Sequence, residues 1–140
     1  NDTDNIFSYH FKAILMSVKK NTILIIDDFP IARKHLINSL MEIDEFQIIE
    51  AETSYQALDV LAKEEISIII SDWNMPEING IDLVKIIRSN AETKEIPIVM
   101  IGSESQKQLF LETLEDHLTG YLMKPFSLAK VKESIHSLGK

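Results

Sequence analysis

Three acidic side chains and one lysine stand where apolar runs of the sequence come to an end. Asp27 and Asp28 directly follow one such run, Asp72 follows a second, and Lys124 follows a third. If these runs are parallel strands, their carboxyl ends lie along one edge of a sheet, which is where ligands bind in open α/β sheets. Each acid alone is better explained as a helix cap or a loop acid, but the three acids and the lysine together predict a site.

The chemistry that such a site would support is phosphoryl transfer. Three carboxylates packed together repel one another and retain protons unless a cation joins them. Mg2+ fits, because it is a hard ion that takes oxygen ligands and keeps several of its waters. A carboxylate oxygen beside Mg2+ and a lysine ammonium can attack phosphorus, while the two cations neutralise the phosphoryl oxygens.

The elements that must position these residues follow from an alternating pattern. Five short runs rich in Ile and Val are typical of strands that are covered on both faces. They are Thr22–Ile26, Phe46–Ala51, Ile66–Ser71, Ile96–Ile101 and Gly120–Met123. Each is followed by apolar residues at helical spacing, in stripes that begin at Ala32, Ala57, Leu83, Leu111 and Leu128. Thr53 and Ser103 each stand three residues before a Gln, a capping-box pattern that predicts a helix start. The alternation predicts an α/β fold of the (βα)5 type, doubly wound, with helices on both faces of a five-stranded parallel sheet.

Composition and charge exclude several classes of function. The 140 residues are 45% hydrophobic and 26% charged, ordinary values for one globular domain. The chain has no Cys, which excludes disulfides, thiolate metal sites and a cysteine nucleophile. A net charge of −8 speaks against direct nucleic acid binding by this domain. No apolar run approaches the roughly 18 residues that would insert across a membrane, and the first residues are acidic rather than basic, unlike a secretory signal. We therefore expect a cytoplasmic protein.

The first 20 residues stand apart from the predicted domain, which we place at residues 21–140. Apolar residues within Ile6–Val18 follow helical spacing, so part of this segment is expected to be helical. It is either a leader that precedes a natural start at Met16 or an amphipathic helix that docks on another surface, of this molecule or of a second one.

The residues at the strand ends, with their neighbours, closely resemble the receiver domain of two-component response regulators, from about Asn21 to Lys140. The motifs are Ile25-Ile-Asp-Asp28, Asp72-Trp-Asn-Met-Pro76 followed by Gly80, and Tyr121-Leu-Met-Lys-Pro-Phe126. Each is weak alone, but their combination is specific, and the first two look most like the single-domain chemotaxis regulators of the CheY type. The resemblance implies a flavodoxin-like sheet of strand order 2-1-3-4-5, which places Asp28 and Asp72 side by side.

The resemblance also implies a role for each residue of the predicted site. Asp72 would accept the phosphoryl group from the phosphohistidine of a histidine kinase or phosphotransfer protein. Lys124 would pair with Asp72 and then with the phosphoryl group. Mg2+ would be held by the side chains of Asp28 and Asp72, by Asp27 through a bound water, and by the backbone carbonyl of Asn74.

The conformational switch would lie at the ends of the fourth and fifth strands. Tyr121 would be the aromatic switch residue, and Glu104 would tune dephosphorylation. Gly102 departs from the family, which has Ser or Thr there to bond a phosphoryl oxygen. Ser103 carries the nearest hydroxyl, but neighbouring strand residues point to opposite faces, so it substitutes only if the chain bends there, and Gly102 permits such a bend. We therefore expect either a weak response to phosphorylation or use of the Ser103 hydroxyl.

Two aromatic residues have open roles. Trp73 either lies over the site, where its fluorescence would report metal binding, or serves packing alone. Phe110 is either partly packed or an apolar contact for a downstream protein. That partner would bind the face formed by the fourth helix, the fifth strand and the fifth helix.

Four readings of the same residues remain. The protein is a stand-alone switch, or it is a receiver cut from a longer regulator with a DNA-binding or enzymatic output, and the length of the natural reading frame would separate the two. A Mg2+-dependent phosphatase with an aspartate nucleophile is a third reading. That chemistry usually places an acid two residues after the nucleophile, where Asn74 cannot donate a proton as a carboxylic acid does. A flavin-binding module is weaker still, because no Gly-rich or Ser/Thr-rich phosphate loop follows the first strand.

Overall fold

The computed structural model describes residues 22–42, 45–114, 117 and 120–124. Its elements are β1 (Thr22–Ile26), α2 (Pro30–Met41), β2 (Gln47–Ala51), α3 (Ser54–Lys63), β3 (Ile68–Asp72), α4 (Gly80–Ser89), β4 (Ile98–Ser103), α5 (Glu104–Leu114) and β5 (Gly120–Lys124). The five predicted strands are confirmed, with ends that differ by at most two residues. The predicted helix within Ile6–Val18 and the stripe from Leu128 lie outside the described residues.

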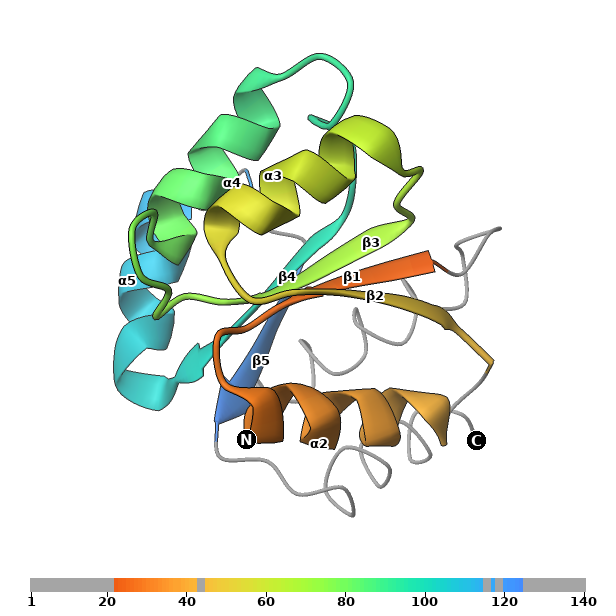
Figure 1. Cartoon of the computed structure of the whole chain (residues 1–140). Helices are drawn as coiled ribbons and strands as arrows, with labels where there is room; N and C mark the ends of the chain where they lie inside the picture. Colours follow the sequence, from red (N-terminus) through yellow and green to blue (C-terminus); the bar gives the residue numbers. More distant parts are fainter. Residues whose placement is uncertain (1–21, 43–44, 115–116, 118–119, 125–140) are drawn as a thin grey trace, which may run out of the picture.

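The five strands are parallel and form one sheet in the order β2-β1-β3-β4-β5, as predicted. From β1 the chain crosses to β2 on one side, and β3 then returns to the other side of β1. The strand order therefore reverses between β1 and β3, which makes their carboxyl ends the expected ligand site. In Figure 1, α2 covers one face of the sheet, whereas α3, α4 and α5 lie on the opposite face.

The core is divided by the sheet into two layers. Leu24, Ile26 and Ile69 pack with α3, α4 and α5, whereas Ile23 and Ile25 pack with α2. Successive strand residues point to opposite faces, so both faces must be apolar where helices cover both. Every apolar side chain of β1 from Ile23 to Ile26 is fully buried, and each such burial contributes about 1.5–3 kcal/mol. The residues of β3 from Ile68 to Ile70 are buried as completely, so both strands hold the residues at their ends from within the core.

The two predicted capping boxes form to different extents. Ser103 and Gln106 form a reciprocal pair, in which each side-chain oxygen accepts the backbone N–H of the other residue, at 3.3 and 2.8 Å. The hydroxyl of Thr53 accepts the N–H of Gln56 at 3.0 Å, but the Gln56 side chain accepts the N–H of Glu52 instead of that of Thr53. Within the described part of the chain, no helix combines the length and the apolar character needed to cross a membrane.

Candidate functional site

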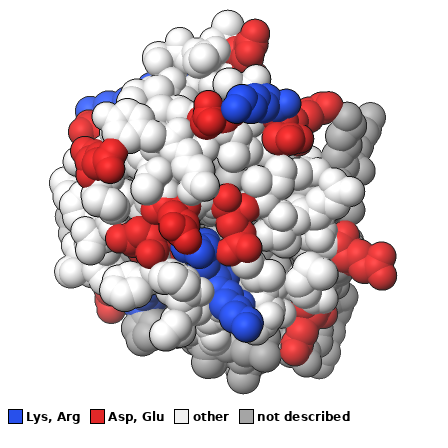
Figure 2. All heavy atoms as spheres, viewed as in Figure 1, with Lys and Arg blue, Asp and Glu red and all other residues white. Residues whose placement is uncertain are grey.

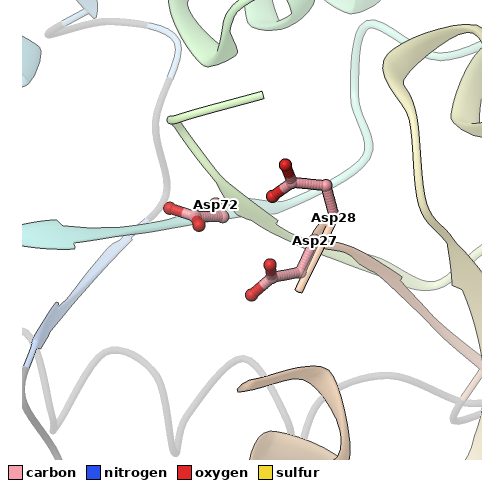
Figure 3. Close-up of side chains that lie close together, drawn as sticks. All are labelled: Asp27, Asp28 and Asp72. Atoms are coloured by element: carbon pink, nitrogen blue, oxygen red, sulfur yellow. The ribbon is translucent and has the colours of Figure 1, made fainter. Parts of the chain in front are cut away.

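The structure brings the three predicted carboxylates together at the reversal point of the sheet. Asp27 and Asp28 follow β1, and Asp72 is the last residue of β3. Each offers one carboxylate oxygen, and these oxygens lie within 4.8 Å of one another. Figure 3 shows all three side chains pointing to the same side of the strand ends. Asp27 and Asp72 are both only 3% exposed, while Asp28 is exposed, so the cluster is reached from solvent on the side of Asp28.

Lys124 joins the cluster from the far side. It is the last residue of β5, which pairs with β4 and not with β3. Its Nζ nevertheless donates to Oδ2 of Asp72 at 3.0 Å, because the long side chain reaches across the end of β4. All four residues that the sequence places at strand ends therefore meet around one buried carboxylate.

The three carboxylates carry more negative charge than Lys124 alone can neutralise. Burial raises the pKa of Asp27 and the carboxylate of Asp72 raises it further, whereas the N–H of Phe29, which donates to Asp27 Oδ1 at 2.9 Å, opposes these effects. Oδ1 of Asp72 is buried, and no hydrogen-bond donor reaches it from any described residue. A buried carboxylate oxygen without a donor is unfavourable unless water or an ion meets it. Three close carboxylates against one ammonium, with an unsatisfied oxygen among them, fit a small divalent cation with oxygen ligands such as Mg2+.

The loop that follows Asp72 is closed by its own backbone. The carbonyl of Trp73 accepts the N–H groups of Met75 and Gly80, both at 2.9 Å. A Cβ atom on Gly80 would lie 2.6 Å from the Cα of Trp73, so only glycine allows this approach. Asn74, whose carbonyl was predicted as a metal ligand, lies at the surface in the same loop.

The aromatic residues near the site are packed together. Phe110 is fully buried and meets Trp73 edge-on, with ring centroids 5.2 Å apart. The interpretation of Phe110 as an apolar contact for a partner is therefore wrong, whereas Leu109 is a large apolar side chain that α5 exposes. Trp73 packs against the core, which agrees with one of its two predicted roles, and its use as a fluorescent reporter of metal binding remains a prediction. Its Nε1 is buried and meets no acceptor among the described residues.

Gly102 makes room for Tyr121. The Tyr121 side chain is only 4% exposed, and its hydroxyl donates to the carbonyl of Ser103 at 2.8 Å. A Cβ atom on Gly102 would lie 2.3 Å from that hydroxyl oxygen, much closer than two such atoms can come. The sequence-based interpretation of Gly102 covered a missing hydroxyl and a possible bend, but not this contact with Tyr121. The signal it missed is the strand pairing, since Met100 pairs with Tyr121 and Gly102 stands two residues on, on the same face.

Ser103 uses its polar groups to start α5. Its hydroxyl accepts the N–H of Gln106 and lies 3.0 Å from the hydroxyl of Ser105, while its own N–H donates to the Gln106 side chain. Glu104 is exposed at the first position of α5 and lies outside the carboxylate cluster. The predicted roles of Ser103 and Glu104 toward a phosphoryl group remain predictions.

Comparison with known proteins agrees with this geometry. The family model described as response regulator receiver domain matches residues 23–136. Chemotaxis protein CheY-3 of Vibrio cholerae is 36% identical over 120 residues, which cover 86% of this chain and 92% of that protein. Chemotaxis protein CheY1 of Helicobacter pylori is 38% identical over 114 residues, which cover 81% and 92%. The solved structure of CheY4 of Vibrio cholerae superposes with a TM-score of 0.73 at 26% identity, over 86% of this chain and 99% of that one. The chain therefore belongs to the response regulator receiver domains of two-component signalling.

Proposed function

We propose that this protein is a phosphoacceptor switch of the chemotaxis type. Asp72 accepts a phosphoryl group from the phosphohistidine of a histidine kinase or phosphotransfer protein, and phosphorylation changes which downstream protein is bound. The observation that carries this proposal is the environment of Asp72. One of its oxygens is held by Lys124, the other has no donor among the described residues, and two further carboxylates lie within 4.8 Å. The family match at residues 23–136 supports a receiver domain at residues 21–140.

The residues present fit Mg2+ as the cofactor. The side chains of Asp28 and Asp72 and the carbonyl of Asn74 would bind the ion directly, and Asp27 would bind it through a water. When bound, the ion supplies positive charge against the phosphoryl oxygens.

Transfer then consists of one exchange of bonds at phosphorus. A carboxylate oxygen of Asp72 attacks the phosphorus of phosphohistidine, so a P–O bond forms as the P–N bond breaks. The electron pair of the broken bond stays on the imidazole nitrogen, which takes a proton. Lys124, which donates to Asp72 at 3.0 Å in the free protein, turns to the transferred phosphoryl group and offsets its charge.

The outcome is a modified protein rather than a turned-over substrate, so the protein acts as a switch and catalyses only its own phosphorylation and dephosphorylation. Tyr121, Gly102 and Ser103 form the switch region, and Glu104 would modulate the loss of phosphate from the exposed start of α5. The downstream partner would bind the predicted face of α5, β5 and the fifth predicted helix, the last of which lies outside the described residues; α5 exposes Leu109. The cytoplasmic location remains a prediction.

The test is labelling by a small phosphodonor. The full chain is incubated with the donor and Mg2+, or with the donor and a chelator, and bound phosphate is measured by intact mass. Phosphate should appear only with Mg2+, and it should vanish in Asp72→Asn. Asp59→Asn is the matched control, since Asp59 is an exposed aspartate on α3 that pairs with Lys63. Undiminished labelling of Asp72→Asn would refute the assignment.

A further inference from the structure

We propose that Arg33 is a positioning residue for the proposed Mg2+ site, on which this inference rests: it fixes the peptide unit between Asp27 and Asp28. Arg33 lies in the first turns of α2 and is only 7% exposed, which is rare for arginine. Its Nη1 donates to the backbone carbonyl of Asp27 at 2.6 Å. A buried guanidinium is thus aimed at the main chain between two of the three clustered acids.

The bond from Arg33 determines how the backbone leaves β1. The carbonyl of Asp27 and the N–H of Asp28 belong to one planar peptide unit, so holding the carbonyl fixes the plane from which the Asp28 side chain departs. On the other side, the N–H of Asp27 donates to the carbonyl of Ala51 at 3.1 Å. The N–H of Phe29 donates to the Asp27 carboxylate at 2.9 Å. Of these three bonds, the one from Arg33 is the only one made by a side chain from outside the turn and the sheet.

The positive charge of Arg33 is offset by two glutamates that do not belong to the carboxylate cluster. Its Nε donates to Glu50 at 2.8 Å, and its Nη2 donates to Glu52 at 3.2 Å. The bond to Glu50 is the largest cause of the raised pKa of Arg33. Figure 2 shows basic side chains at the middle of the viewed face with acidic side chains on both sides of them.

A positioning role and a simple charge effect predict opposite changes in Mg2+ affinity when Arg33 is removed. A net positive charge beside the carboxylates would repel Mg2+, so a pure field effect predicts that removing Arg33 strengthens Mg2+ binding. If Arg33 acts by geometry, its removal weakens Mg2+ binding, because Asp28 no longer leaves the chain in a fixed direction. Partners that orient metal ligands typically change metal affinity by about 10- to 100-fold.

The chain offers a matched control in Arg88. Arg88 lies near the end of α4 and also donates to backbone carbonyls, those of Lys94, Ile96 and His117, at 2.7–2.9 Å. Ile96 precedes the start of β4, so this clamp sits at the opposite edge of the sheet from the carboxylates. Loss of Arg88 should lower stability without reaching the site.

The experiment compares Mg2+ affinity with stability in four full-length variants: Arg33→Lys, Arg33→Met, Arg88→Lys and Arg88→Met. Affinity is measured by titration calorimetry and stability by thermal unfolding. Both Arg33 variants should bind Mg2+ about 10- to 100-fold more weakly. Lysine fails as well because a point charge cannot replace the planar fork that meets one carbonyl and two carboxylates. The Arg88 variants should lose stability at unchanged affinity. Wild-type affinity in Arg33→Lys, or an equal loss in the Arg88 variants, would overturn the proposal.

A readout without metal separates this inference from the proposed function. Amide hydrogen exchange at Asp27 and Phe29 should accelerate in metal-free Arg33→Lys and stay unchanged in Arg88→Lys. If the wild type binds no Mg2+, the proposed function fails, while exchange still shows whether Arg33 orders this turn. Unchanged exchange in Arg33→Lys overturns the positioning role by itself. Should Arg33→Met fail to fold, the lysine variant decides both readouts.

Discussion

A single methyl group at Gly102 should disturb the end of the sheet, because the Tyr121 hydroxyl already occupies its place. The added Cβ would lie 2.3 Å from that oxygen, 2.9 Å from Oε1 of Gln106 and 3.1 Å from a ring carbon of Phe110. The end of the Gln106 side chain can move aside. Tyr121 cannot retreat without leaving a buried position and breaking its bond to Ser103.

The size of the effect follows from the two ways in which Gly102→Ala can be accommodated. If the ring stays, the site is overpacked, which typically destabilises a protein by about 1–3 kcal/mol. If the ring leaves, a hydrogen bond of about 1 kcal/mol is lost together with the burial of the ring. Both routes predict a loss of at least about 1 kcal/mol of unfolding free energy. For domains near this size, that lowers the melting temperature by about 2–8 °C.

The assay is a double-mutant cycle measured by denaturant unfolding. Tyr121→Phe removes the colliding oxygen, so Gly102→Ala should cost much less in that background, with a coupling energy of about 1–2 kcal/mol. Gly120→Ala on β5 is the control, because among the described residues its Cβ would meet only Val99, at 3.5 Å, an ordinary contact. The reasoning is refuted if Gly102→Ala is as mild as Gly120→Ala, or if the Gly102 and Tyr121 effects are additive.

Two further predictions concern the carboxylates. In the absence of divalent ions, Asp27→Asn should raise stability at neutral pH by about 1 kcal/mol, the repulsion of one close like-charged pair even in water. The pKa of Asp27 in the folded protein is raised above its ordinary value of 3.8, so the wild type loses stability as the pH rises above 3.8 and this carboxyl ionises. The stability gained by Asp27→Asn should therefore vanish below pH 3.8. A gain that is independent of pH in thermal unfolding would contradict this. Asp28→Ala should weaken Mg2+ binding at least about tenfold, whereas Asp59→Ala should not, because Asp59 is exposed on α3. Equal affinities in calorimetric titration would exclude the site.

The parts of the structure that local patterns encode were predictable. Strands buried on both faces require continuous apolar runs, and polar residues directly after such runs must lie at the edge of the sheet. The predicted starts of two strands were wrong by two residues, because Ile66 and Ile96 continue the apolar pattern but precede β3 and β4 in the chain.

The features that were missed depend on contacts between elements. The fit of Tyr121 against Gly102 depends on the pairing of β4 with β5, and the burial of Phe110 depends on how α5 is rotated against Trp73. Arg33 is ordinary in the sequence of a surface helix, and only the fold turns its side chain toward Asp27. Local periodicity contains none of this information.

The central claim is that Asp72 itself carries the phosphoryl group, and chemical trapping tests it most directly. Borohydride reduces an aspartyl phosphate to homoserine, and peptide mass spectrometry then identifies the residue that was modified. After incubation with a phosphodonor and Mg2+, we predict homoserine at position 72 and its absence when a chelator is present. Homoserine at Asp27 or Asp28, with Asp72 unchanged, would contradict the claim.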